Sequence, residues 1–563
     1  MADIVVGAYL FRRLREFGIE TLFGVPGDYE LDLLDHVEEG GLQWSGSPNE
    51  LVAAYSADGY ARIKGAGALV TTFGPGETSA LCGLAGAYCE FVPVVHIVGY
   101  PGLKAQRGTQ ILHHTLGDKK YDHYIKMSDQ ISCASVVLMD ASTATSEIDR
   151  ILQAMFYHQQ PVYIGLPIDI ALSKVSPSSL ETSIIRDLPL NDPMVEEFVV
   201  KEIYRRLDAS KNAVIIVDGG ATRHGVVSEV AKLIDITQAP HFVTGMGKGA
   251  VNERHPRFGG GYNGASTKAD VKHTIENSDC VLWVGSYLSD FNTGEFTMKV
   301  SAAATIDFQR FYVMIGDKKY DVKMKYVLQK LINTIEMQPL SVVVTDMPCT
   351  PFDGLQAPES QDITHKWLWQ RFTSFLEPGD FVITETGTAQ AGMNEAWYPE
   401  NVHMFTQSVF GSIGYATGAA VGSAIAAREV NPPYKRLILV TGDGSLQLTV
   451  QGFSMLQRNG VTPIIFVINN KGYTVERLIH GLNADYNNIP LWNYAALLKA
   501  MGPDVASKSY QVAKSAELDQ LLQDEAFCHA SYPQLVELFM DPFDCPDSIK
   551  LLGAAAGTHN MGS

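Results

Sequence analysis

One strand–helix–strand segment constrains this chain more than any other feature. Residues 436–468 read as a buried strand, an amphipathic helix and a second buried strand, with Asp443 after the first strand and Asn470 after the second. In open α/β sheets, ligands bind beyond the carboxyl ends of the strands. We therefore expect both side chains at one mouth of a parallel sheet. The predicted bounds are 436–441 for the first strand, 446–458 for the helix and 463–468 for the second strand.

The pairing of Asp443 with Asn470 indicates a magnesium site. Magnesium takes near-octahedral oxygen ligands and uses one or two protein carboxylates, with phosphates and water completing the shell. The glycines at 442 and 444 let the backbone turn sharply and expose amide groups to a diphosphate. A Gly-Asp-Gly turn alone would favour an ordinary turn. A dinucleotide fingerprint is excluded because the third glycine is missing, and a P-loop is excluded because no Gly-Lys-Ser/Thr follows.

Composition excludes several classes of function. The 563 residues, 46% of them hydrophobic, suit a large α/β protein of two to four domains. A formal charge of −19 argues against nucleic-acid binding, and no apolar run approaches the roughly 20 residues that cross a bilayer. The seven cysteines form no Cys-x-x-Cys pair, which argues against a disulfide framework or a zinc site. No targeting signal is visible, so we expect a cytoplasmic protein.

The α/β pattern repeats three times along the chain, and two polar, proline-containing stretches separate the repeats. These stretches are residues 176–192 and 337–362, and the second is too long for an ordinary loop inside a domain. We expect three domains, each an open, mainly parallel sheet flanked by helices. Their predicted ranges are 1–180, 195–340 and 360–550. Predicted strands outside the segment above are 21–23, 68–72, 92–98, 162–166, 213–217 and 280–284.

Motifs spread over nearly the whole chain resemble those of one enzyme family. The chain looks like a fungal-type pyruvate decarboxylase, within the wider thiamine diphosphate-dependent 2-oxo acid decarboxylases. The motifs that carry the resemblance are Gly24-Val25-Pro26-Gly27-Asp28, Asn49-Glu50-Leu51, Ala57-Asp58-Gly59-Tyr60-Ala61-Arg62, His113-His114-Thr115, Glu385-Thr386-Gly387-Thr388, Gly411-Ser412-Ile413-Gly414, Gly442-Asp443-Gly444-Ser445 and Asn469-Asn470-Lys471-Gly472-Tyr473-Thr474-Val475-Glu476.

The resemblance implies thiamine diphosphate and Mg²⁺ as cofactors, held in sites between subunits. The first domain would hold the aminopyrimidine and the third domain of another subunit the diphosphate, so we expect a homodimer or homotetramer. Magnesium would be bound by Asp443, Asn470 and the carbonyl group of Gly472. The residues expected to bind the cofactor are Glu50, Thr388, Gly411, Ser412, Ile413, Asp443, Gly444, Ser445, Asn470, Gly472, Tyr473, Thr474 and Val475.

Glu50 has the central catalytic role by this resemblance. Its carboxyl group would hydrogen-bond the pyrimidine ring and favour the tautomer that activates the thiazolium carbon. Local sequence allows another interpretation, since Ser47 three residues before Glu50 matches a helix capping box, and both roles could coexist. The resemblance also assigns proton transfer to Asp28, His113, His114 and Glu476, of which the two adjacent histidines are expected to point in different directions.

The substrate pocket departs from the family pattern. By resemblance it is lined by Phe291, Thr386, Gln390, Ala391, Phe410 and Val475. Ala391 stands where relatives carry phenylalanine, and Phe410 stands where they carry tryptophan. These smaller side chains predict a roomier pocket, in which Gln390 can offer a hydrogen bond. The positions that match a regulatory histidine and cysteine are Phe91 and Gly220, which argues against activation through that thiol.

The predicted reaction is non-oxidative decarboxylation of pyruvate or a larger 2-oxo acid to an aldehyde and CO₂. A carboligase that passes the same enamine intermediate to an aldehyde or ketone acceptor, giving a 2-hydroxy ketone, is the alternative left open. A catalytically silent paralogue is disfavoured because Glu50, Asp443 and Asn470 are all present.

Overall fold

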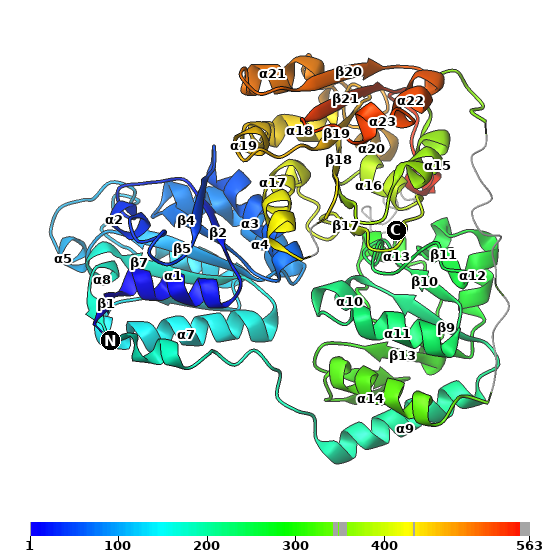
Figure 1. The fold of residues 1–563 in the computed structure, drawn as a ribbon, viewed down its shortest axis with the longest axis horizontal. Coiled ribbons are helices and arrows are strands. Elements are labelled where there is room, and N and C mark those ends of the chain that lie inside the picture. Colours follow the sequence, from blue (N-terminus) through cyan, green and yellow to red (C-terminus); the bar gives the residue numbers. More distant parts are fainter. Residues whose placement is uncertain (1, 342–346, 348–356, 432–433, 552–563) are drawn as a thin grey trace.

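The structure is a computed structural model that describes residues 2–341, 347, 357–431 and 434–551. Three α/β lobes follow one another along the chain (Figure 1). This arrangement confirms the predicted three-domain α/β architecture. The strands of each sheet lie within one predicted domain range, while the domain boundaries themselves stay a prediction. Much of the second predicted linker, 337–362, lies outside the described residues.

The N-terminal domain contains a six-stranded parallel sheet. Its strands follow the order β3-β2-β4-β5-β7-β6. They are β3 (Gln43–Gly46), β2 (Thr21–Gly24), β4 (Gly67–Thr72), β5 (Val94–Tyr100), β7 (Val162–Pro167) and β6 (Ala134–Val137). The main helices are α1 (Val6–Glu16), α3 (Glu50–Lys64), α4 (Pro75–Cys89) and α7 (Ala141–His158).

The middle domain has a seven-stranded sheet that is parallel except at one edge. The last two strands form antiparallel pairs that close that edge. In spatial order the strands are β11 (Phe258–Gly261), β10 (His241–Val243), β9 (Ala213–Val217), β12 (Cys280–Val284), β13 (Thr305–Phe308), β14 (Val313–Ile315) and β15 (Lys318–Tyr320). The main helices are α9 (Pro193–Ala209), α11 (Val227–Thr237), α12 (Ala269–Glu276) and α14 (Met324–Met337).

The C-terminal domain returns to a six-stranded parallel sheet. In spatial order its strands are β17 (His403–Phe405), β16 (Phe381–Thr384), β18 (Leu437–Gly442), β19 (Ile464–Asn469), β21 (Gln534–Phe539) and β20 (Lys508–Val512). Its helices include α15 (His365–Phe375), α16 (Thr388–Met393), α17 (Tyr415–Glu429), α18 (Asp443–Thr449), α19 (Gly452–Arg458), α20 (Thr474–Ile479) and α22 (Ser515–Leu522).

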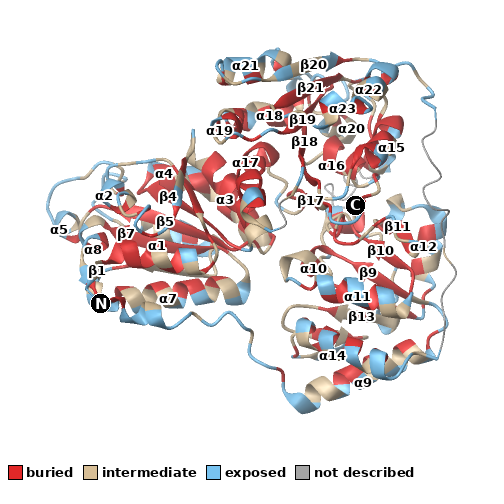
Figure 2. Ribbon diagram, viewed as in Figure 1, coloured by how far each residue is buried: buried red, intermediate tan, exposed pale blue. Residues whose placement is uncertain are grey.

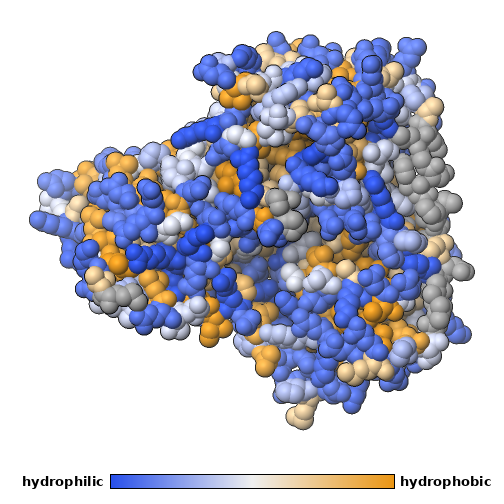
Figure 3. All heavy atoms as spheres, viewed as in Figure 1, coloured by the Kyte–Doolittle hydropathy of each residue, from blue (hydrophilic) through white to orange (hydrophobic). Residues whose placement is uncertain are grey.

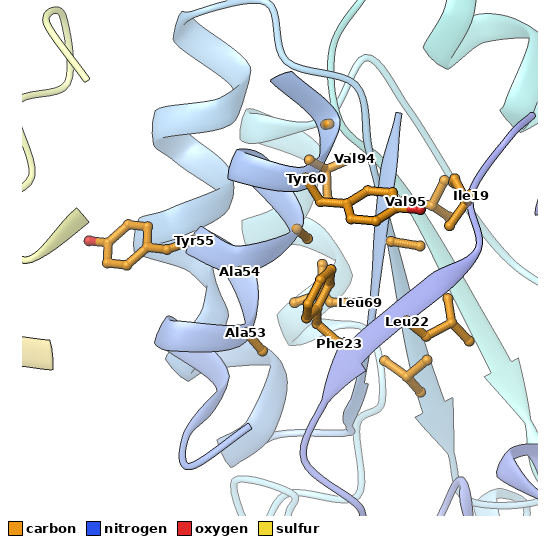
Figure 4. Close-up of a cluster of buried hydrophobic side chains, with 14 of the residues drawn as sticks. Ile19, Leu22, Phe23, Ala53, Ala54, Tyr55, Tyr60, Leu69, Val94 and Val95 are labelled. Atoms are coloured by element: carbon orange, nitrogen blue, oxygen red, sulfur yellow. The ribbon is translucent and has the colours of Figure 1, made fainter. Parts of the chain in front are cut away.

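The central strands are buried on both faces, which explains their unbroken apolar sequences. Figure 2 shows this burial in all three sheets. In the N-terminal domain Tyr60 of α3 packs against Phe23 of β2, in a cluster that includes Leu69 of β4. Tyr55, on the same helix, points away from this cluster toward the C-terminal domain (Figure 4).

Close helix packing joins the N-terminal and C-terminal domains. Helices α3 and α17 meet at backbone distance, because a Cβ atom at Gly59 would lie 2.2 Å from the carbonyl oxygen of Ala419. A Cβ at Gly422 would lie 1.7 Å from the oxygen of Ser56. Glycine is therefore required at both positions, which fixes α17 and the loop before it against the N-terminal domain.

The segment 436–468 forms the predicted strand–helix–strand unit with one difference. The expected helix 446–458 is wrong in detail, since α18 begins at Asp443 and a turn at 450–451 separates it from α19. Packing against α17 accounts for the break. The Thr449 hydroxyl donates to the carbonyl of Gly414 at 2.6 Å, and Gly452 lies against Thr417, where a Cβ would approach to 2.9 Å.

No helix among the described residues is long and apolar enough to span a membrane. The visible face of the molecule is mostly hydrophilic, with apolar residues scattered over all three lobes (Figure 3).

Candidate active site

Three oxygen atoms converge where β18 and β19 end. The side-chain oxygen of Asn470 lies 3.3 Å from Asp443 Oδ1 and 2.8 Å from the carbonyl oxygen of Gly472. The amide nitrogen of Asn470 instead faces Thr474 Oγ1 at 2.9 Å. That hydroxyl donates its proton to the carbonyl of Pro542, 2.9 Å away, so its lone pairs are free to accept from the amide.

This arrangement fits a magnesium ion. Oxygen ligands that are neighbours on a Mg²⁺ octahedron, each about 2.1 Å from the metal, lie about 3 Å apart. The Asn470 oxygen has this spacing from the oxygens of both Asp443 and Gly472. Without a cation they would repel one another, and the amide would be more stable after rotation by half a turn. The predicted metal ligands are therefore brought together as expected.

The Asp443 carboxylate is held rigidly from the protein side. Its Oδ2 accepts the backbone N–H of Lys471 at 2.7 Å and of Gly472 at 3.3 Å, and its Oδ1 accepts that of Gly444 at 2.8 Å. Burial raises the pKa of Asp443 to about 6, although these N–H groups oppose the shift. The absence of a side chain at Gly444 is necessary, since a Cβ would lie 2.7 Å from the ring of Tyr473.

A cavity of about 1270 Å³ extends from this corner between the middle and C-terminal domains. Most of the cofactor and pocket residues predicted from sequence line it. They are Phe291, Thr386, Thr388, Gln390, Ala391, Phe410, Gly411, Ile413, Asp443, Gly444, Ser445, Asn470, Gly472, Tyr473, Thr474, Val475 and Glu476. Ser412 is not among the lining residues. Its hydroxyl contacts Tyr55 and Cys82 of the N-terminal domain, so its predicted role in cofactor binding gains no support from the cavity.

The substrate end of the cavity is partly polar. Gln390 is 8% exposed, accepts a hydrogen bond from Thr386 Oγ1 at 3.2 Å and donates one to Ser408 Oγ at 2.8 Å. The rings of Phe291 and Phe410 are 45% and 44% exposed and face this space. Sequence reasoning missed Ser408, which lines the cavity and accepts the hydrogen bond of Gln390; no motif spacing could have identified it, because the contact joins two separate segments.

The other predicted catalytic residues belong to the N-terminal domain. His113 Nε2 lies 2.9 Å from Asp28 Oδ2, and the His113 ring stacks on Tyr29 with centroids 4.8 Å apart. One ligand atom each from Asp28, His113 and His114 falls within 4.8 Å of the others. The expectation that the histidines diverge is wrong. His114 has a left-handed backbone, with φ of 65°, and burial followed by the charge of His113 lowers the pKa of its ring.

Glu50 begins helix α3 but does not cap it. The N-cap is Asn49, whose side chain accepts the backbone N–H of Val52 at 2.8 Å. The capping-box interpretation is therefore wrong, because Ser47 lies outside the helix and its hydroxyl makes no hydrogen bond within the described chain. Burial raises the pKa of Glu50. Its Oε1 lies near the first turn of α4, 3.2 Å from the position of a Cβ on Gly76.

The turn before α4 brings these N-terminal groups together. Pro75 is the first residue of α4, a position where proline is favourable because its missing N–H would have no helical partner. Gly74 has φ of 81°, and a Cβ there would lie 2.2 Å from the carbonyl oxygen of His114. The turn thus supports both His114 and Glu50.

Within one chain the predicted site is divided. Among the described residues, those lining the cavity all follow residue 243, and Asp28, Glu50, His113 and His114 are not among them. One half of the predicted site lies in the cavity and contains the metal ligands, Glu476 and Gln390. The other half is the N-terminal group, which consists of Asp28, Glu50, His113 and His114.

Comparison with known proteins accounts for these features. Residues 4–126, 200–333 and 385–538 match, in order, the N-terminal thiamine pyrophosphate-binding, central and C-terminal thiamine pyrophosphate-binding domains of the thiamine pyrophosphate enzymes. Pyruvate decarboxylase isozyme 3 of Saccharomyces cerevisiae is 44% identical over 551 residues, which cover 98% of both chains. The pyruvate decarboxylase of Aspergillus terreus is 44% identical over 562 residues, covering 99% of this chain and 97% of the relative.

The chain belongs to the pyruvate decarboxylase-like thiamine pyrophosphate enzymes. As a thiamine diphosphate enzyme it uses that cofactor with Mg²⁺, which agrees with the oxygen cluster at Asp443. The relatives are named as decarboxylases, so the carboligase alternative is not favoured.

Proposed function

We propose that this thiamine diphosphate enzyme decarboxylates a 2-oxo acid to an aldehyde and carbon dioxide. The observation that carries the proposal is the oxygen cluster of Asp443, Asn470 and Gly472, at the mouth of a cavity large enough for cofactor and substrate. Relatives named pyruvate decarboxylase that match nearly the whole chain support the same reaction.

In this proposal the C-terminal domain holds the charged end of the cofactor. Asp443, Asn470 and the Gly472 carbonyl would hold Mg²⁺, and the backbone around Gly444 and Ser445 would bind the diphosphate. When bound, thiamine diphosphate supplies a thiazolium ring that accepts the electron pair left by departing carbon dioxide. The residues of this chain bind, orient and exchange protons around that ring.

The N-terminal group supplies the proton chemistry. The raised pKa of Glu50 suits a carboxyl group that shares a proton with a ring nitrogen. Asp28 orients His113 through their 2.9 Å contact, and an imidazole ring can both accept and donate a proton. These three residues, with His114 and Glu476, are proposed to deliver and remove the protons that the aldehyde product requires.

The pocket is proposed to accept 2-oxo acids larger than pyruvate. Ala391 offers only a methyl group to the cavity, and the exposed rings of Phe291 and Phe410 provide apolar walls. Gln390 keeps its amide toward Thr386 and Ser408, so it shapes the pocket and supplies polar groups near the substrate.

Two copies of the chain are proposed to form each complete site. The N-terminal group and the cavity are separate within one chain, and catalysis needs both. A homodimer or homotetramer that brings Glu50 of one subunit to the Asp443 corner of another would meet this need.

The test is a turnover assay with purified protein, thiamine diphosphate and Mg²⁺, using pyruvate, branched 2-oxo acids and phenylpyruvate. Release of carbon dioxide with an equimolar aldehyde supports the proposal. Formation of a 2-hydroxy ketone as the main product when an aldehyde is added would favour the carboligase. Sedimentation of the same sample at increasing concentration gives its oligomeric state. Turnover should appear only at concentrations at which dimers or larger species form.

A further inference from the structure

A second carboxyl group lies buried behind the N-terminal catalytic residues. Glu30 is 0% exposed, and neither of its carboxyl oxygens makes a hydrogen bond within the described part of the chain. It immediately precedes the short helix α2 (Leu31–Leu34), but its side chain does not cap that helix. Its side chain therefore has no evident role in secondary structure.

Two glycines create the space that Glu30 occupies. A Cβ at Gly27 would lie 3.0 Å from Glu30 Oε1. A Cβ at Gly99, on β5, would lie 2.6 Å from the Glu30 Cβ and 2.7 Å from the carbonyl oxygen of Tyr29. A side chain at either glycine would displace the carboxyl group, so the backbone around it is shaped to admit it.

Thr72 links this carboxyl group to Glu50. A Cβ on Gly27 would also lie 2.7 Å from Thr72 Oγ1. This hydroxyl, like the Glu30 carboxyl group, makes no hydrogen bond among the described residues. The Thr72 methyl group faces Glu50 instead. A Cβ on Gly76 would lie 3.0 Å from this methyl group and 3.2 Å from Glu50 Oε1. The threonine therefore lies between the two carboxyl groups.

Electrostatics favours a neutral Glu30. A buried carboxylate without a partner is costly, and such a group keeps its proton instead. Burial raises the pKa of Glu30 to about 8, opposed by Thr72 and the backbone of Gly27. The titratable groups that face it, Asp28 and Glu50, both add negative charge and raise the pKa further.

We propose that Glu30 is a positioning residue for Glu50: its neutral carboxyl group packs beside Thr72 and keeps a second negative charge away from the Glu50 carboxyl group. The inference rests on the proposed role of Glu50 in holding the cofactor. Ionisation of Glu30 at alkaline pH would place a second negative charge behind Glu50. The two charges would compete for protons, and Glu50 would be less able to hold the cofactor ring in its active form.

The first test needs no cofactor and compares thermal unfolding of the wild type and Glu30→Gln from pH 5 to pH 9. The folded state holds the Glu30 proton up to about pH 8, whereas the unfolded chain releases it near its ordinary pKa. The wild type should therefore lose stability relative to the glutamine variant as pH rises, and the difference should level off above about pH 8. Asp307→Asn is the matched control, because burial raises the pKa of Asp307 only to about 6. The stability difference between the wild type and Asp307→Asn should level off about two pH units lower.

The second test measures thiamine diphosphate affinity, with Mg²⁺ present, by quenching of intrinsic fluorescence at pH 7 and pH 9. Between pH 7 and pH 9 we expect the affinity for thiamine diphosphate to fall at least threefold in the wild type and in Asp307→Asn, and to stay unchanged in Glu30→Gln. Equal losses in all three proteins would overturn the proposal. So would a Glu30→Gln variant that fails to fold, since a neutral isostere must fit if Glu30 is neutral. If no protein binds the cofactor, the proposed function fails, and the unfolding curves still decide the protonation of Glu30.

Discussion

Replacing Glu50 with glutamine should separate catalysis from folding in this protein. Glu50 is the first residue of α3, where a negative charge near the helix N-terminus is worth about 0.3–1 kcal/mol. Burial raises the pKa of the carboxyl group and so offsets part of that gain. The actual cap, Asn49, remains in place. We therefore expect the free energy of unfolding to change by less than about 1 kcal/mol.

The loss of turnover should be much larger. A positioned acid or base contributes about 10²- to 10⁴-fold to the rate, which corresponds to about 3–5 kcal/mol of transition-state stabilisation. Glutamine can still donate a hydrogen bond but cannot exchange a proton. We expect kcat to fall by about 10²-fold or more while the variant remains folded.

The assay couples aldehyde formation to the oxidation of NADH by alcohol dehydrogenase, and circular dichroism gives the unfolding curve. Asp140→Ala is the control, because Asp140 caps α7 through the backbone N–H of Ser142 at 2.9 Å and belongs to none of the predicted catalytic motifs. It should lower the thermal midpoint, because the helix loses its N-cap, and keep its turnover. A Glu50→Gln variant with kcat within tenfold of the wild type would refute the catalytic role.

Three further predictions concern the metal, the pocket and regulation. Asn470→Ala should weaken Mg²⁺ binding at least tenfold in a calorimetric titration with thiamine diphosphate present, because one of three converging oxygens is lost; unchanged affinity would contradict the assigned ligand set. Ala391→Phe should lower the ratio of kcat/KM for phenylpyruvate to that for pyruvate by about 10- to 100-fold, since its ring would occupy cavity space; an unchanged ratio would place the specificity elsewhere. The rate curve for the wild type should be hyperbolic, because Gly220 has no room for a thiol, its Cβ position lying 2.6 Å from Gly285; a sigmoidal curve would show another route of activation.

Local pattern was enough to predict much of the fold. The strands at 213–217 and 280–284 coincide with β9 and β12, because strands buried on both faces require continuous apolar runs. The helix expected at 446–458 divides into α18 and α19, because Gly452 and Thr449 pack against α17. No periodicity in the segment itself records a contact with a distant helix.

The candidate site was predictable where motifs are contiguous and not where contacts are distant. Asp443 and Asn470 follow neighbouring strands, so topology alone places them together. The interaction of Gln390 with Ser408 and the position of Glu30 behind Glu50 depend on contacts between separate elements. The resemblance to a family named the catalytic groups, but it did not indicate their geometry.

The sequence by itself determined the cofactor chemistry, because metal and diphosphate binding need particular residue types at the ends of consecutive strands. The tertiary structure decided which groups are charged and which act together. Burial raises the pKa of Glu30, Glu50 and Asp443, and burial exists only in the folded chain. The division of the predicted site into an N-terminal group and a C-terminal cavity is likewise a property of the folded chain, since only the folded structure shows which residues line the cavity.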